Sequence, residues 1–374
     1  MKIGHYSPTI FAHGGIGQYI QRLGDAQQSR GHDVVYFSKN NSEAAQCTIA
    51  PTDRDLFSLA KGAGLDILHL HKEVASVPPP DLHVVRTMHG NQASCPSGSR
   101  YLSRRGTQCD RTYSAIGCFW GHVVDGCGSS KPERMKAHFA RIKKEKTVLP
   151  HIQTLTVSEF LRQRMIIEGY PASHVQTLLS PAPVVSESAS IPENDLPHFV
   201  FLGRLVPQKG IDWLIRSLLQ VKSECLVEIA GDGYFAEEAK AMADRLGVAS
   251  KVRFLGWVDA PTAARTIQKS RAVIFPSVWH EPAGLVTLEA AAHARPVITA
   301  AVGGIPEYAD PSFSIVLEPH DETALAAAID RFCDDKKLAD SMGRAGYEYV
   351  TQNHSFDGFC DSLSDIYTQI IDVN

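Results

Sequence analysis

Residues 280–289 read HEPAGLVTLE and follow an apolar run at 272–278. The run is typical of a buried strand, and proline is well tolerated in the first turn of a helix. The pattern therefore predicts a strand followed by a helix that begins near Pro282. Ala283, Gly284 and Leu285 would then present backbone amides without intrahelical partners, and such amides can bind an anion.

Two acids flank this predicted anion site, Glu281 just before the helix and Glu289 two turns into it. Carboxylates would repel a phosphate unless they bind something neutral, such as the hydroxyl groups of a sugar. The alternative is structural: an acid that complements the helix dipole and a second one on a solvated face. Two acids beside an anion site make that alternative less attractive.

The segment GRLVPQKG, residues 203–210, follows another apolar run and precedes a helical pattern. Arg204 and Lys209 can converge on a diphosphate, the first as a planar fork and the second as a point charge. The spacing alone leaves a pair of solvated loop charges equally open.

A glycine-rich turn near the N-terminus contains Gly14, Gly15 and Gly17, directly before an amphipathic helical pattern. Glycines let a backbone approach a ligand, and the helix start offers free N–H groups to an anion. A tight turn that needs positive φ explains the same residues. The full dinucleotide fingerprint is absent, so the two interpretations stand about even.

Strand-like and helix-like patterns alternate along the chain, which predicts parallel, doubly wound α/β sheets. The pattern runs twice, and residues 184–197, rich in Ser, Pro and acids, separate the two sets. We therefore expect an N-terminal domain over 1–183 and a C-terminal domain over 197–353, both Rossmann-like. The predicted strands are 33–38, 67–71, 83–89 and 154–158, then 198–205, 226–230, 252–258, 272–278 and 296–300.

Composition supports a globular two-domain enzyme. The 374 residues are 44% hydrophobic and 21% charged, with a formal net charge of −4. This charge provides no global attraction for nucleic acid. The first residues lack a secretory signal and no run approaches the roughly 20 apolar residues of a bilayer-spanning helix, so a cytoplasmic protein is expected.

Together, the E-x7-E pattern at 281–289, the GRL-x3-KG segment, Gly231-Asp232-Gly233 and the GGIPE segment at 303–307 resemble glycosyltransferase family 4. The resemblance implies the GT-B fold, two Rossmann-like domains facing across a cleft, with a final helix, 354–374, that returns to the N-terminal domain. It also implies a retaining transfer of a hexose from a UDP- or GDP-sugar to a glycan or lipid-linked saccharide. Bacterial polysaccharide or glycoconjugate synthesis is the expected context.

The resemblance also implies roles. Arg204 and Lys209 would neutralise the leaving diphosphate, Glu281 would bind hydroxyls of the transferred sugar and Glu289 the ribose. His89, at a predicted strand end, would face that sugar, although a structural histidine is a common alternative at such a place. No catalytic metal or other cofactor is expected. The remaining donor-binding residues would be Gly14, Gly15, Gly17, Gly203, Gly231, Val258, Ala283, Gly284 and Leu285.

A long segment at 94–128 departs from the family pattern and contains Cys95, Cys109, Cys118 and Cys127. Core packing alone would order such a segment poorly, which makes a cross-link or a structural zinc attractive. The spacing lacks the paired CxxC of common zinc sites, so we expect reduced or variably paired thiols in an acceptor-side loop, with zinc as the weaker alternative.

Residues 131–146 (KPERMKAHFARIKKEK) form a basic amphipathic pattern with Met135, Phe139 and Ile142 on one side of a helix. Such a helix can rest on anionic lipid. A solvated helix packed on its domain by that apolar stripe is slightly favoured.

Two other function classes remain open. One is a GT-B epimerase or phosphorylase, although we locate neither the additional acids nor the cofactor lysine that these would need. The other is a non-catalytic sugar-nucleotide-binding scaffold, which an intact set of Arg204, Lys209, Glu281 and Glu289 makes hard to reconcile.

Overall fold

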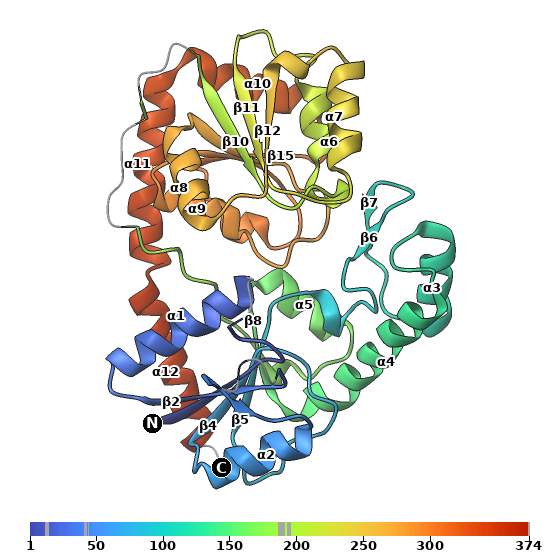
Figure 1. Ribbon diagram of the computed structural model, residues 1–374, viewed down its shortest axis with the longest axis vertical. Helices are drawn as coiled ribbons and strands as arrows, with labels where there is room; N and C mark the ends of the chain where they lie inside the picture. Colours follow the sequence, from blue (N-terminus) through green and yellow to red (C-terminus); the bar gives the residue numbers. More distant parts are fainter. Residues whose placement is uncertain (12–14, 41–42, 44, 186–190, 193–195, 373–374) are drawn as a thin grey trace.

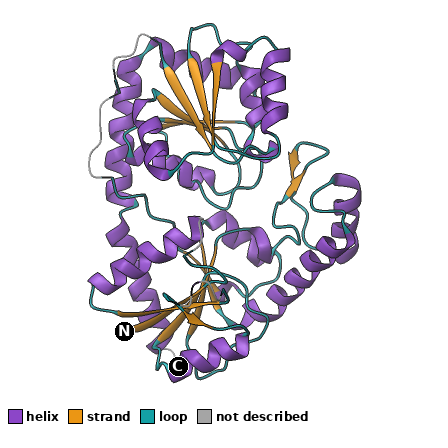
Figure 2. Ribbon diagram, in the orientation of Figure 1, coloured by secondary structure: helices purple, strands orange, loops and turns teal. Residues whose placement is uncertain are grey.

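The computed structural model describes residues 1–11, 15–40, 43, 45–185, 191–192 and 196–372, and contains two α/β units (Figure 1). Each unit has a central sheet with helices on both faces (Figure 2). Since both faces of these sheets are covered, the central strands of each sheet are almost entirely buried, as parallel sheets require.

The first sheet has the strand order β3-β2-β1-β4-β5-β8-β9, and its paired strands are parallel. Its strands are β1 (Lys2–Tyr6), β2 (Asp33–Ser38), β3 (Thr48–Ile49), β4 (Ile67–Leu70), β5 (Val84–Met88), β8 (Gln153–Thr156) and β9 (Val175–Thr177). Its helices are α1 (Gly15–Ser29), α2 (Asp53–Gly62), α4 (Pro132–Val148) and α5 (Glu159–Ile167), with short turns η2 (Asn91–Ala93), η4 (Leu149–His151) and η5 (Ala172–His174).

The second sheet has the order β12-β11-β10-β13-β14-β15, again with parallel pairs. Its strands are β10 (His198–Leu202), β11 (Leu226–Ala230), β12 (Val252–Gly256), β13 (Ala272–Phe275), β14 (Val297–Ala300) and β15 (Ser314–Leu317). The helical elements are η6 (Pro207–Lys209), α6 (Ile211–Ser217), α7 (Ala236–Arg245), η7 (Ala249–Lys251), α8 (Ala260–Lys269), α9 (Leu285–Ala292), η8 (Ile305–Glu307), α10 (Glu322–Asp334) and α11 (Lys336–Asn353).

The doubly wound architecture agrees with the prediction from sequence, but several predicted strand ends are wrong. The strand predicted over 272–278 ends at Phe275, and the one over 252–258 ends at Gly256. The residues after each strand leave the sheet at its carboxyl edge, where they form loops rather than ladder pairs. The sheets lie on either side of the predicted linker, while the exact domain boundaries stay a prediction because 186–190 and 193–195 lie outside the described residues.

The final helix α12 (Phe356–Asp372) packs on the N-terminal unit, as expected (Figure 1). Its buried residues Phe359, Leu363 and Tyr367 join a cluster with Ile3 of β1 and Ile67 of β4. Salt bridges from Arg30 to Asp357 and Asp361 support the same contact. The apolar stripe of the helix is thereby buried against the opposite domain.

The cysteine segment extends from the N-terminal unit beside α4. It contains a small antiparallel pair, β6 (Tyr101–Leu102) with β7 (Thr107–Gln108), the short helix α3 (Ala115–Trp120) and the π-helical turn η3 (Gly121–Asp125). No residue of α3 is buried. All four cysteines have free thiols and line one small enclosed cavity of about 20 Å³. The segment therefore has little apolar core of its own.

None of the helices in the described part of the chain combines the length and apolar character that a transmembrane segment needs.

Candidate active site

Two glycine turns meet at the carboxyl edge of the second sheet. Gly203 follows β10 and Gly231 follows the neighbouring β11, with φ of 155° and 147°. A Cβ atom added to Gly231 would lie 1.8 Å from the carbonyl oxygen of Gly203. Only glycine lets the two backbones come this close, so the turns after β10 and β11 pack directly against each other.

Lys209 and Glu281, 72 positions apart in the sequence, form an ion pair at this edge. Lys209 Nζ lies 2.6 Å from Glu281 Oε1, and the Ser277 hydroxyl lies 2.7 Å from the same oxygen. The ammonium group also lies over the rings of Phe275 and Trp279, at 5.5 and 5.6 Å. Glu281 is buried, so this carboxylate and the lysine hold each other in fixed positions.

Arg204 differs from Lys209 because it is exposed, and no described acid forms a salt bridge with it. Its guanidinium charge is thus uncompensated, whereas that of Lys209 is balanced by Glu281. A diphosphate bound here could pair directly with the Arg204 guanidinium. It would have to compete with the Glu281 carboxylate for the Lys209 ammonium group. Sequence spacing identified both cations but missed the ion pair, Ser277 and Trp279.

The segment that contains Gly303 and Gly304 packs directly on the loop before α9. Gly303 has φ of 58°, and a Cβ atom there would lie 2.3 Å from the carbonyl oxygen of Glu281. The Gly304 amide donates to that same oxygen at 2.7 Å. The two motifs therefore fix the backbone of Glu281 together.

The predicted helix start at Pro282 is wrong. Helix α9 begins at Leu285 with Gly284 as its N-cap, because the backbone of Glu281 is engaged by Gly304 and cannot join a helical turn. Among the described residues, no group accepts a hydrogen bond from the amides of Gly284 and Leu285. The free amides of Gly284 and Leu285 thus belong to residues that the sequence predicted for the anion site, although the helix begins three residues later than expected.

Glu289 lies about one turn into α9 rather than two. Burial raises the pKa of its carboxyl group, and no described side chain donates to it. A half-buried carboxyl group without a protein partner is suited to receive a ligand hydroxyl. Val258 lies past the end of β12, in the loop that was expected to meet the base.

The N-terminal unit contributes a second set of residues. Gly15 is the first residue of α1 and Gly17 is buried within it, while Gly14 lies outside the described residues. His89 follows β5, and the Tyr19 ring stands edge-on to it at 5.3 Å between centroids. Burial lowers the pKa of His89 to about 3, so its ring is neutral at physiological pH.

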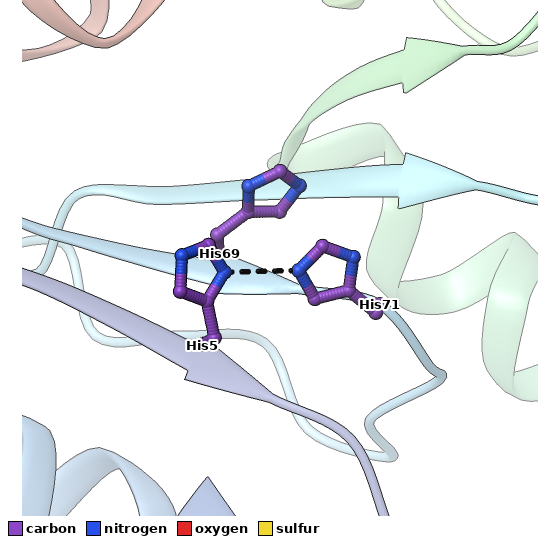
Figure 3. Close-up of side chains that lie close together, drawn as sticks. All are labelled: His5, His69 and His71. Carbon is purple, nitrogen blue, oxygen red and sulfur yellow. Dashed lines mark hydrogen bonds between the residues drawn. The ribbon is translucent and has the colours of Figure 1, made fainter. Parts of the chain in front are cut away.

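Behind His89 lie three further buried histidines, His5, His69 and His71 (Figure 3). Each of the three offers one ring nitrogen within 4.8 Å of the others, a grouping that could hold a metal ion. Burial lowers the pKa of His5 to about 4 and those of the other two well below the usual range. Sequence reasoning missed this cluster because it needs β1, which carries His5, to pair with β4, which carries His69 and ends just before His71.

Contacts between the two units surround these residues. The Glu307 carboxylate accepts hydrogen bonds from the amides of Glu159 and Phe160, at the start of α5, at 2.6 and 2.8 Å. The Asn91 side-chain amide donates to the His280 carbonyl at 2.9 Å. The Tyr308 hydroxyl contacts the Val157 carbonyl. The loops around Glu281 are therefore tied to the N-terminal unit on both sides.

Residues 186–349 match the sequence profile of the family described as "Glycosyl transferases group 1". The C-terminal domain belongs to this family. The match covers Arg204, Lys209, Glu281 and Glu289, and thus every charged residue predicted to bind the donor. The group 1 domain together with the first unit forms a GT-B fold, two Rossmann-like domains with a returning helix.

Two curated relatives are glycosyltransferases by name or by the synthesis that they are named for. An uncharacterized glycosyltransferase of Methanocaldococcus jannaschii is 30% identical over 47% of this chain and 45% of its own length. Glycogen synthase of Mycobacterium tuberculosis is 24% identical over 97% and 92%. The alignment with the first of these relatives therefore spans less than half of its length.

Two solved structures share the fold over essentially the whole chain. Sucrose-phosphate synthase of Thermosynechococcus elongatus superposes with a TM-score of 0.74 at 18% identity, covering 100% of both chains. HepE of Anabaena, solved in complex with UDP-glucose, has a TM-score of 0.67 at 14% identity, covering 99% of this chain and 100% of its own.

The packing at Gly303 can be tested with Gly303→Ala. The left-handed backbone alone costs an alanine about 1–2 kcal/mol, and overlap with the Glu281 carbonyl adds about 1–3 kcal/mol. Gly247→Ala is the matched control, since Gly247 has φ of 70° in open space. Urea unfolding should show the larger loss for Gly303→Ala. Equal losses would mean that the loop moves freely away from Glu281.

Proposed function

We propose that this chain is a retaining family 4 glycosyltransferase that moves a hexose from a nucleotide sugar to a hydroxyl of a glycan or lipid-linked saccharide. The observation that carries the proposal is the convergence of Arg204, the Lys209–Glu281 pair and the free amides of Gly284 and Leu285 on one sheet edge. Cations and amides suit a diphosphate, and the acids suit sugar and ribose hydroxyls.

In the proposed reaction, a bond forms between the acceptor oxygen and the anomeric carbon, and the bond from that carbon to the diphosphate breaks. The diphosphate leaves with the bonding electrons and takes the acceptor proton on the same face of the sugar. Arg204 and Lys209 stabilise the negative charge that grows on it. His89 and Glu281 hold the sugar, and Glu289 holds the ribose.

Support for the nucleotide-sugar donor comes from the group 1 domain and from HepE, which binds UDP-glucose. Glycogen synthase, the relative that aligns along nearly the full chain, supports a saccharide acceptor. We propose synthesis of a bacterial polysaccharide or glycoconjugate as the context.

A panel of UDP- and GDP-sugars tests the class, with slow donor hydrolysis and transfer to added saccharides as readouts. Release of nucleoside diphosphate with one donor supports the transferase. Tight donor binding without turnover in the presence of acceptors would favour a scaffold. Recovery of an epimerised sugar, or turnover that depends on phosphate, would favour the other enzyme classes.

Substitutions separate the cations from the ribose acid. Arg204→Ala and Lys209→Ala should lower kcat and kcat/KM together by on the order of 10²-fold, because they stabilise charge in the transition state. Glu289→Gln should mainly raise the donor KM, because the ribose changes little during reaction. Steady-state kinetics with one donor measures all three. Turnover within a few-fold of the parent for both cation variants, with Glu289→Gln inactive, would reverse the assigned roles.

Chelation tests the proposed independence from a catalytic metal. With Arg204, Lys209 and helix amides around the diphosphate, transfer should persist in EDTA. Loss of activity that manganese restores, without any change in circular dichroism, would contradict this. Loss together with unfolding of the cysteine segment would instead indicate a structural zinc bound by Cys95, Cys109, Cys118 and Cys127.

A membrane-facing surface is also proposed, beside the basic helix α4. Exposed apolar side chains gather on α3 and η3: Ile116, Phe119, Trp120, Val123 and Val124. They lie next to α4, since the His122 ring packs 5.5 Å from that of Phe139. Helix α4 exposes Lys136, Lys143 and Lys144 and buries Ile142. Exposed apolar groups beside cations suit the surface of an anionic bilayer.

Vesicle flotation tests this surface. The protein should float with vesicles that contain phosphatidylglycerol but not with phosphatidylcholine alone, and Trp120→Ser should weaken binding by about tenfold, near 1.4 kcal/mol. Trp257→Ser is the control, because Trp257 is 75% exposed on the other domain. Equal binding by both variants would exclude this surface.

A further inference from the structure

Three of the four histidines, His5, His71 and His89, are joined by hydrogen bonds into a row, and the fourth, His69, stacks on His71. His5 lies on β1, His69 on β4, and His71 and His89 just past the ends of β4 and β5. His71 stacks on His69 with centroids 4.2 Å apart and lies 5.7 Å from His89 (Figure 3 shows the three inner rings). The row thus runs from the interior of the N-terminal sheet to the predicted sugar site.

The hydrogen bond between Gln27 and His5 fixes which nitrogen donates and which accepts along the row of histidines. Gln27 of α1 is buried, and its Oε1 lies 2.7 Å from His5 Nε2, so His5 donates there. His5 Nδ1 must then accept from His71 Nε2, at 3.0 Å. His71 Nδ1 in turn accepts from His89 Nε2, at 3.4 Å. A neutral imidazole has one donor and one acceptor, so each ring sets the tautomer of the next.

A second branch sets the orientation of the Gln27 amide. Its Nε2 donates to the Tyr367 hydroxyl at 3.5 Å, and that hydroxyl donates to His69 Nδ1 at 2.6 Å. His69 Nε2 donates to Thr87 Oγ1 at 2.7 Å. Tyr367 belongs to α12, so the returning helix participates in the network.

This arrangement favours a hydrogen-bonded network over a metal site. Both ring nitrogens of His69 already have partners, and so do both of His71 and both of His5. The buried Arg86 also repels positive charge in the cluster, since it lowers the pKa values of His69, His71 and His89. A divalent cation would have to displace several bonds and meet that charge.

We propose that Gln27, His5 and His71 are positioning residues that fix His89 as the tautomer with its proton on Nε2. His89 Nδ1 is then a hydrogen-bond acceptor for a hydroxyl of the transferred sugar. The role of His89 toward the sugar rests on the proposed function, whereas the tautomer does not.

The tautomer is measured directly by ¹⁵N NMR of the histidine rings, in the whole chain without substrate. The parent should show His89 protonated on Nε2, assigned by comparison with His89→Ala. Gln27→Met removes the acceptor at nearly constant volume and should yield a mixture of tautomers. Gln28→Met, one residue along α1 and exposed, should change nothing. An unchanged His89 signal in folded Gln27→Met would overturn the proposal.

A double-mutant cycle separates positioning from mere structural support. Gln27→Met should lower kcat about threefold to tenfold with little change in donor KM. In the His89→Ala background, the same substitution should have no further effect, because Gln27 acts through His89. Additive losses would show that Gln27 does not act through His89 and would overturn the proposal. If Gln27→Met fails to fold, Tyr367→Phe, which removes the group that orients the Gln27 amide, replaces it with the same readouts.

Two further outcomes are decisive. Zinc, copper or iron could copurify with the protein in stoichiometric amount and be lost in His5→Ala. That result would identify a metal site and overturn the proposed role of the hydrogen-bonded histidines. If no nucleotide sugar is turned over, the proposed function fails, but the NMR result still decides whether the tautomer is fixed.

Discussion

The ion pair between Lys209 and Glu281 couples two loops that leave the sheet after different strands. Lys209 follows β10 and Glu281 follows β13, and these strands are neighbours in the sheet. Both side chains of the pair are largely buried, and the rings of Phe275 and Trp279 lie against the ammonium group, so the attraction between the two charges is stronger than in water and holds both loops in place. Breaking one partner would leave a buried charge, which is costly. The geometry of the proposed donor site therefore depends on this contact.

Close backbone contacts at glycines fix the other loops around this site. Gly231 meets the Gly203 carbonyl, and Gly303 meets the Glu281 backbone, at distances that exclude any side chain. The loops around the donor site are thus assembled by backbone contact and not by core packing. This leaves the side chains of Arg204 and Glu289 available for the donor that we propose. The contacts of Glu307 and Tyr308 with α5 and its surroundings join this assembly to the N-terminal domain.

The cysteine segment, residues 94–128, is held in place by other kinds of contact. Its helix α3 has no buried residue, apolar side chains are exposed on α3 and η3, and its four thiols line a small cavity. The buried Arg100 lines the same cavity and bonds to the carbonyls of Ser94 and Arg111. The segment is held by polar contacts to its own backbone, by packing along α4 and by contacts with the second unit, where Tyr101 joins the core cluster and His320 bonds to the Gly106 carbonyl.

The sequence by itself determined the alternation of strands and helices, the two-domain organisation and the return of the final helix, and it singled out Arg204, Lys209, Glu281 and Glu289 as candidates. These follow from local periodicity, turn chemistry and motif resemblance, all of which act over short stretches of chain. The start of α9, the Lys209–Glu281 pair and the row of histidines were decided only by the tertiary structure. His5, His71 and His89 meet because parallel strands bring their carboxyl ends to one edge, and Gln27 and Tyr367 reach them from two helices that are remote in sequence. Such contacts depend on strand order and on how helices cross the sheet, which periodicity does not encode.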